Sequence, residues 1–229
     1  MGAFLLSVNR AGGLPSALPV ERITPWLLPS VDGYQPGECP SGRWIRSRFF
    51  STPEEAAEPD MPLWRGTREP AADGRPGTSG LLCLAEATLD NRSELVDSLG
   101  VAASVTDAAV IAAAYRRWGA SCVDHLKGDF AFVVWDPVAR RLVAATDPCG
   151  VKAIRYWSQG DILIVSTRTR AVASALSIAP TLNDPLFCSY LGGDLSAWNG
   201  STAYKEISLV PAGHVLVAEP GGMRCHRYR

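Results

Sequence analysis

Cysteine and histidine are the side chains of this sequence best suited to bind a metal ion or to act as a nucleophile. Three histidines show no spacing typical of metal ligands, and no Cys-x-x-Cys pair occurs. A structural zinc site needs four such ligands grouped closely, so we predict no metal site and no cofactor in this chain. The six cysteines are predicted to be free thiols, and they are Cys39, Cys83, Cys122, Cys149, Cys188 and Cys225.

Composition restricts the class of protein to which these residues belong. The 229 residues carry 22 Lys+Arg against 23 Asp+Glu, a net charge of −1, and 47% are hydrophobic. Such a balance argues against nucleic-acid binding and supplies enough apolar residues for a large core. No apolar run reaches the ~18 residues needed to cross a membrane. The first eight residues lack a basic leader, so we expect no signal peptide and a cytoplasmic location.

Hydrophobic patterning predicts strands joined by short turns, with a few helices between them. Strands are expected at 2–8, 44–50 and 81–85, and hairpins at 130–146, 154–166 and 214–228. Helices are expected at 91–99, from 106 to about 118, at 123–126 and at 169–175, with a further helix beginning near residue 53. The strand at 130–135 is apolar at every position, which is typical of a strand covered on both faces. Together these elements indicate an antiparallel, layered α+β domain.

Five blocks in order resemble the N-terminal glutaminase-type domain of asparagine synthetases, a class II glutamine amidotransferase. The blocks include Leu-Asp-Asn-Arg-Ser-Glu-Leu, Lys-Gly-Asp-Phe-Ala-Phe-Val-Val-Trp-Asp and Asp-Pro-Cys-Gly-Val-Lys, and all five lie at 89–95, 106–119, 126–136, 147–152 and 209–214. The resemblance implies the four-layer αββα sandwich of N-terminal-nucleophile hydrolases, with two antiparallel sheets. It implies a single amidotransferase-like domain over 1–229, in which 14–79 is divergent and rich in loops.

The nucleophile of that family is a cysteine at the second position, exposed when the initiator Met is removed. Its thiol attacks the glutamine side-chain amide while its own α-amino group acts as the base. This sequence has Gly2 there. Because glycine has no side chain, and because the reaction needs the thiol and the amine on one residue, the sequence predicts no glutaminase activity.

Other family positions are also altered. The segment Asn-Gly-Glu, which supplies oxyanion donors and substrate contacts, is replaced by Glu-Ala-Thr at 86–88. Asp107 aligns with the aspartate that binds the glutamine α-amino group, but given the other changes we favour a role in capping a helix together with Thr106. The arginine that binds the substrate carboxylate has no clear counterpart, and Arg46 and Arg48 are the candidates.

Inactive domains of this kind occur in relatives that use an internal amine, such as β-lactam synthetases and lasso-peptide cyclases. The resemblance therefore implies a supporting domain for an ATP-dependent amide-forming domain, in cis or in trans, which would bind ATP and Mg²⁺. The Ser-Gly-Gly-x-Asp-Ser loop of that second domain is not found in these 229 residues, since Gly192-Gly193-Asp194 lacks the serine. Two alternatives remain open: an active glutaminase whose start is misassigned, and a stand-alone module that binds a precursor peptide.

A partner domain would need an interface on this chain. The segment 185–198 contains several large apolar residues and is the predicted contact surface, through Phe187, Tyr190, Leu191 and Trp198. Neither a nucleic acid nor a membrane is expected as a partner.

Overall fold

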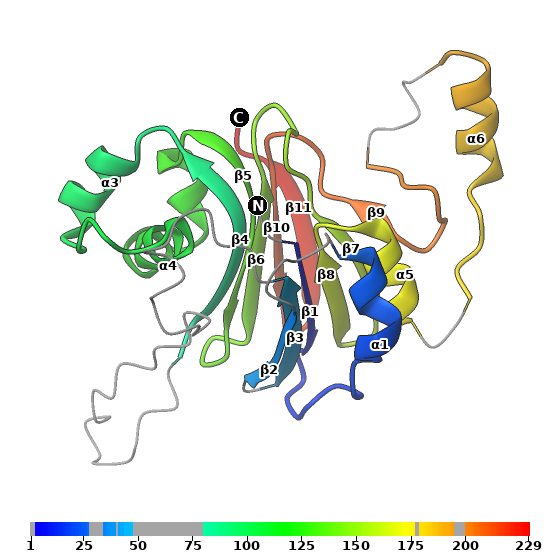
Figure 1. Cartoon of the computed structure of the whole chain (residues 1–229), viewed down its shortest axis with the longest axis horizontal. Helices are drawn as coiled ribbons and strands as arrows, with labels where there is room; N and C mark the ends of the chain where they lie inside the picture. Colours follow the sequence, from blue (N-terminus) through cyan, green and yellow to red (C-terminus); the bar gives the residue numbers. More distant parts are fainter. Residues whose placement is uncertain (1–2, 28–33, 40, 48–79, 177–178, 195–199) are drawn as a thin grey trace.

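Two antiparallel sheets stacked face to face form the centre of the molecule (Figure 1). The computed structural model describes residues 3–27, 34–39, 41–47, 80–176, 179–194 and 200–229. The six-stranded sheet contains, in spatial order, β2 (Tyr34–Cys39), β3 (Gly42–Ser47), β1 (Phe4–Asn9), β8 (Ile162–Ser166), β7 (Arg155–Gln159) and β9 (Ser208–Leu209). The five-stranded sheet contains β11 (Gly222–Arg227), β10 (His214–Glu219), β6 (Arg141–Thr146), β5 (Gly128–Asp136) and β4 (Leu82–Leu89).

Helices cover the outer face of each sheet, which completes four layers (Figure 1). The five-stranded sheet is covered by α3 (Arg92–Leu99), α4 (Asp107–Trp118) and the 3-10 helix η2 (Gly119–His125). The six-stranded sheet is covered by α1 (Val20–Ile23), the 3-10 helix η1 (Thr24–Trp26) and α5 (Thr169–Ala175). Helix α6 (Asp184–Leu191) projects away from the sandwich. The predicted layered α+β architecture is confirmed.

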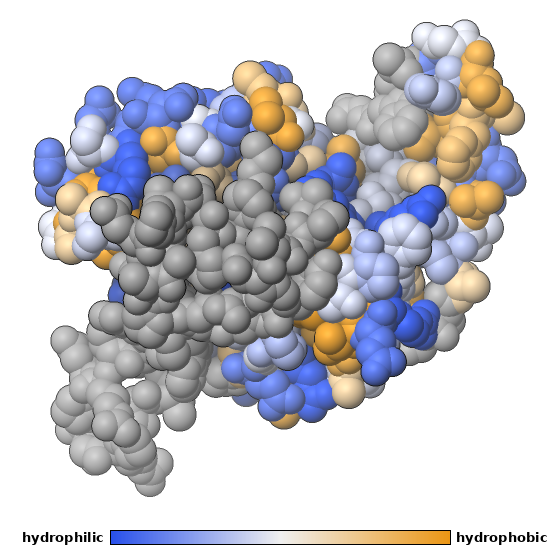
Figure 2. Space-filling view, viewed as in Figure 1, coloured by the Kyte–Doolittle hydropathy of each residue, from blue (hydrophilic) through white to orange (hydrophobic). Residues whose placement is uncertain are grey.

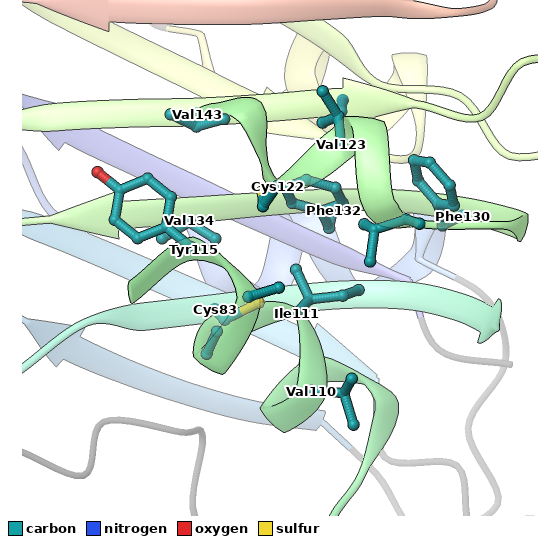
Figure 3. Packing of buried hydrophobic residues seen from close by; sticks show 14 of the residues in the cluster. Cys83, Val110, Ile111, Tyr115, Cys122, Val123, Phe130, Phe132, Val134 and Val143 are labelled. Atoms are coloured by element: carbon teal, nitrogen blue, oxygen red, sulfur yellow. The ribbon is translucent and has the colours of Figure 1, made fainter. Parts of the chain in front are cut away.

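Three hydrophobic clusters hold the four layers together, and strand β5 contributes to two of them. Phe130, Phe132 and Val134 point toward α4 and η2, where Figure 3 shows them packed with Ile111 of α4. The intervening β5 side chains point to the opposite face, into the cluster between the two sheets. Because side chains alternate along a strand, a strand that is apolar at every position must be covered on both faces, as the sequence predicted.

A glycine sets the close approach of β5 to the end of β4. Gly128 has a φ of +121°, and a Cβ atom there would lie 2.3 Å from the carbonyl oxygen of Thr88. Any other residue would clash with the β4 backbone and would also be strained. This requirement explains the glycine of the Lys-Gly-Asp-Phe block.

Most of the predicted elements are present, with differences at their ends. The strand expected at 81–85 continues to Leu89 as β4, and the helix expected at 123–126 is the 3-10 helix η2. The strand expected at 44–50 is described only as far as Ser47, and the helix expected near residue 53 lies outside the described residues. Strand β2 and helices α1 and α6 were not predicted, since they are short and contain or follow proline. Among the described residues, no helix is long and apolar enough to cross a membrane.

Candidate functional site

The candidate site lies at one end of the sandwich. This is the end at which β1 begins, just after residue 2. Strand β8 fixes this end of β1: the Ser166 hydroxyl donates to the Phe4 carbonyl oxygen at 2.6 Å. The Phe4 N–H in turn donates to the Thr167 hydroxyl at 3.4 Å. These contacts hold the first residues of β1 in register with β8, although residue 2 itself is not described.

Glu86 is the acidic side chain that strand β4 brings to this part of the molecule. Leu82 and Leu84 of β4 pack into the cluster between the sheets, and the two-residue period of a strand places Glu86 on the same face. Its exposed fraction is only 5%. A carboxylate buried to this extent needs a charged or hydrogen-bonding partner, because desolvation penalises the ionised form.

Lys152 is that partner. Its ammonium nitrogen Nζ lies 2.9 Å from Oε1 of Glu86, and the lysine side chain is 14% exposed. A guanidinium nitrogen of Arg168 lies 3.9 Å from the other carboxylate oxygen, Oε2. The carboxylate therefore has a close cation on one oxygen and a more distant cation on the other. An ionised carboxylate is only an acceptor, so Glu86 cannot donate a hydrogen bond to a developing oxyanion.

The loop before Lys152 is organised by a buried aspartate. Asp147 has no exposed surface, and its carboxylate accepts from the backbone N–H groups of Cys149, Val151 and Lys152 at 2.9, 3.1 and 2.7 Å. Three backbone donors on one carboxylate fix the path of the chain between β6 and β7. This fixed path explains the Asp-Pro-Cys-Gly-Val-Lys block, and it positions the Lys152 side chain opposite Glu86.

Asp107, a predicted ligand for a substrate amine, is occupied by contacts within the chain. Its Oδ2 accepts from the Leu89 N–H at 3.3 Å, and its Oδ1 lies 3.0 Å from Nε of Arg92. The residue before it, Thr106, caps α4 by accepting from the Ala109 N–H. Asp107 thus joins the end of β4 to the start of α4, and a role in binding substrate stays a prediction.

The two arginine candidates lie in and beyond β3. Arg46 pairs with Phe4 across the sheet, and it lies on the same face of β3 as Trp44, which packs between the two sheets. This places Arg46 beside the start of β1, where a group that binds a substrate carboxylate would be required. Arg48 lies outside the described residues.

Two features of the site were only partly visible in the sequence. The replacement of the oxyanion segment by Glu-Ala-Thr was visible, but the pairing of Glu86 with Lys152 bridges 66 positions and required the structure. Arg155, at the start of β7, and Arg168, just after β8, were not predicted; the Thr-Arg-Thr-Arg run at 167–170 was a signal for Arg168 only. Within the described residues, no three His, Cys, Asp or Glu side chains form a group that could hold a metal ion.

Comparison with known proteins identifies the class to which this architecture belongs. Residues 89–229 match the family model described as a glutamine amidotransferase domain. The chain belongs to this family; it is a class II glutamine amidotransferase domain related to asparagine synthetases and fungal amidases.

Two curated relatives support this assignment. The chain is 30% identical over 123 residues to asparagine synthetase [glutamine-hydrolyzing] 3 of Bacillus subtilis, and 31% identical over 118 residues to Amidase chry2 of Gibberella zeae. These matches cover 54% and 50% of this chain but only 20% and 16% of the relatives.

The structural matches extend over the whole chain. This chain superposes on glutamine phosphoribosylpyrophosphate amidotransferase from B. subtilis with a TM-score of 0.58 and a sequence identity of 16%. The superposition covers 100% of this chain and 49% of the B. subtilis chain. A second structure, an allosteric regulatory enzyme of purine biosynthesis, gives a TM-score of 0.59 at 17% identity and the same coverage. The N-terminal-nucleophile hydrolase-like fold with two antiparallel sheets is therefore confirmed.

Proposed function

We propose that this chain is a catalytically inactive amidotransferase domain that supports an ATP-dependent, amide-forming enzyme related to asparagine synthetase. In this proposal the domain releases no ammonia from glutamine. It stabilises or helps to load a synthetase-type domain, in cis or in trans, as in the lasso-peptide macrolactam cyclases that the sequence resembles.

The observation that carries the proposal is Gly2, two positions before the first residue of β1. In this family the residue at that point supplies the attacking thiol. Glycine at this position leaves no atom that could form a thioester with glutamine.

The environment of Glu86 supports the same conclusion. Where the family has an amide-bearing residue among its oxyanion donors, this chain has a carboxylate ion-paired with Lys152 at 2.9 Å. Oxyanion stabilisation depends on donors directed at the developing negative charge. A carboxylate at that position can only accept hydrogen bonds, so the change removes a donor on which glutamine hydrolysis depends.

Ammonia release from glutamine by the purified protein tests the proposal. We expect a rate equal to that of heat-denatured protein in the same buffer. Intact mass spectrometry of the same sample identifies the first residue of the mature chain. Ammonia release clearly above the control would overturn the proposal, and a mature chain beginning with cysteine would identify an active glutaminase with a different start.

Helix α6 is the surface through which we propose that the synthetase-type domain binds. Phe187, Tyr190 and Leu191 are 41%, 56% and 83% exposed, and Figure 2 shows an apolar region over this projecting helix. Exposed apolar groups concentrated on one element are typical of an interaction surface. Trp198, the fourth residue predicted for this interface, lies outside the described residues.

The relatives are consistent with such a partner, because the matched segment forms a fifth or less of their length. The synthetase-type domain would bind ATP and Mg²⁺. Co-purification of the two domains, expressed as separate chains, tests the interface. Leu191→Glu is expected to reduce recovery of the complex, whereas Val138→Glu, at an exposed apolar position on the β5–β6 turn, is the matched control. Equal recovery with both variants would contradict the assignment of α6.

A further inference from the structure

A pocket on the outer side of the six-stranded sheet carries an excess of positive charge that the proposed function does not use. The pocket has a volume of about 290 Å³. Its lining residues come from η1, from β7, from the residues just after β8 and from the start of α5. Its lining, among the described residues, contains three arginines and no acidic residue, and consists of Trp26, Arg155, Thr167, Arg168, Thr169 and Arg170.

Arg155 is fixed in place by the backbone around it. Its Nη1 atom donates to the carbonyl oxygens of Ala153 and Thr167, at 2.8 and 2.9 Å. Burial, followed by the neighbouring charge of Arg168, lowers the pKa of Arg155 below its usual value, and Glu86 opposes this shift. Arg155 is therefore a buried cation with a second cation beside it.

Among the described residues, Glu86 is the carboxylate that contacts an arginine of the pocket, and it is already engaged. Glu86 lies 2.9 Å from Lys152 but 3.9 Å from Arg168, so its closest cation is the lysine and not an arginine of the pocket. One carboxylate therefore serves Lys152, Arg168 and, more weakly, Arg155. In the part of the chain that the structure describes, Arg155, Arg168 and Arg170 line the pocket with no acidic residue beside them in the lining, so an external anion could neutralise their charge.

Arg170 and Trp26 complete the opposite wall. The Arg170 guanidinium carbon lies 4.5 Å from the centroid of the Trp26 ring, which is within the range of a cation–π contact. This contact keeps the guanidinium over the ring. A second hollow of about 430 Å³ shares Trp26 and Arg170 with the first and has apolar residues such as Leu176 in its wall.

We propose that this pocket binds an oxyanion, a phosphate or carboxylate group of a small molecule, through Arg155, Arg168 and Arg170. Arginine presents a planar set of N–H donors that matches the geometry of phosphate and carboxylate oxygens. The threonine hydroxyls of the lining add polar contacts, and the adjoining hollow accommodates an apolar part of the same ligand. The pocket shares Thr167 and Arg168 with the candidate site, where Thr167 accepts from the Phe4 N–H and Arg168 faces Glu86.

Isothermal titration at constant ionic strength tests the proposal, with inorganic phosphate and succinate as the two probes. At least one probe should bind in a saturable manner, and the stronger of the two identifies the chemistry of the natural ligand. Arg168→Gln and Arg170→Gln should each weaken binding about tenfold, as expected for the loss of one charge-assisted contact. Arg224→Gln, at an exposed position on β11, is the matched control and should leave the affinity unchanged.

Arg170→Gln is the more informative variant, because Arg170 is exposed and its replacement should not disturb folding. Circular dichroism of each variant establishes that the fold is kept. Absence of saturable binding with both probes would overturn the proposal. So would an affinity that is unchanged in Arg170→Gln, or equally reduced in Arg224→Gln.

Discussion

Removing the ammonium group of Lys152 isolates a buried charge and should be among the most destabilising changes at the candidate site. In Lys152→Met, the Glu86 carboxylate loses its partner at 2.9 Å while its exposed fraction is only 5%. Breaking a buried ion pair from one side costs about 3–5 kcal/mol. Arg168 lies 3.9 Å from the other oxygen and partly compensates the charge. We therefore expect the free energy of unfolding to fall by about 3 kcal/mol, which is the lower end of that range.

The double variant separates the pair from its surroundings. In Glu86→Gln/Lys152→Met both charges are absent, and replacing a buried ion pair by neutral groups is often close to neutral. The double variant should therefore be more stable than Lys152→Met alone. A double-mutant cycle then gives a coupling energy of about 1.5–3 kcal/mol, within the range found for residues in direct contact.

Urea unfolding followed by circular dichroism measures each free energy, with an unchanged m-value as the sign that only stability has changed. For a chain of this length, a loss of about 3 kcal/mol lowers the Tm by roughly 6–12 °C. Arg141→Met is a useful comparison, since its ion pair with Glu219 is more exposed and should contribute less than about 1 kcal/mol. A loss below about 0.5 kcal/mol for Lys152→Met, or an additive cycle, would refute the reasoning.

Three further predictions concern the framework of the site. Asp107→Ala removes the acceptor for the Leu89 N–H and the ion pair with Arg92. It should lower the free energy of unfolding by about 1–3 kcal/mol. An unchanged free energy of unfolding would mean that Asp107 is not needed for the fold and is available for a ligand. Asp147→Asn weakens three backbone hydrogen bonds of a fully buried carboxylate. It should lower the free energy of unfolding by about 2–3 kcal/mol. An unchanged urea midpoint would argue against a role of Asp147 in positioning the loop. Burial raises the pKa of the Cys122 thiol from 9.0 to about 12. The unfolded chain therefore loses this proton first, and stability should fall as pH rises above 9, by up to about 1.4 kcal/mol per pH unit from this group. In Cys122→Ala, stability should fall less steeply as the pH rises above 9. A slope identical to that of the unchanged protein would show that the Cys122 thiol does not cause the decline.

The core of the fold was predictable because its elements have strong local patterns. Strand β5 is apolar at successive positions, and α4 begins at Thr106 and ends near the Arg116-Arg117 pair before Gly119. Such signals depend only on neighbouring residues. By contrast, β2 contains Pro36 and Gly37, which disfavour a strand in isolation, and it forms through its pairing with β3.

The sequence was enough to predict which family residues the site has lost. It was not enough to predict the contacts that replace them. Gly2 and Glu86 could be identified as departures from the family pattern without coordinates. Arg155 and Arg168 converge through the pairing of β7 with β8, which the predicted hairpin at 154–166 already implied. The ion pair between Glu86 and Lys152 instead joins segments that are 66 positions apart along the chain. Only the stacking of the two sheets brings them together. No local property of the sequence encodes this ion pair.

Labelling with an electrophilic glutamine analogue tests the central claim most directly, because such a reagent captures a working amidotransferase nucleophile as a covalent adduct. The protein is incubated with the reagent, digested and mapped by mass spectrometry, so that reaction at the exposed Cys149, Cys188 and Cys225 is distinguished from reaction at the start of the chain. The account predicts that the peptide preceding and including β1 remains unmodified. A stoichiometric adduct on that peptide, prevented by excess glutamine, would contradict it.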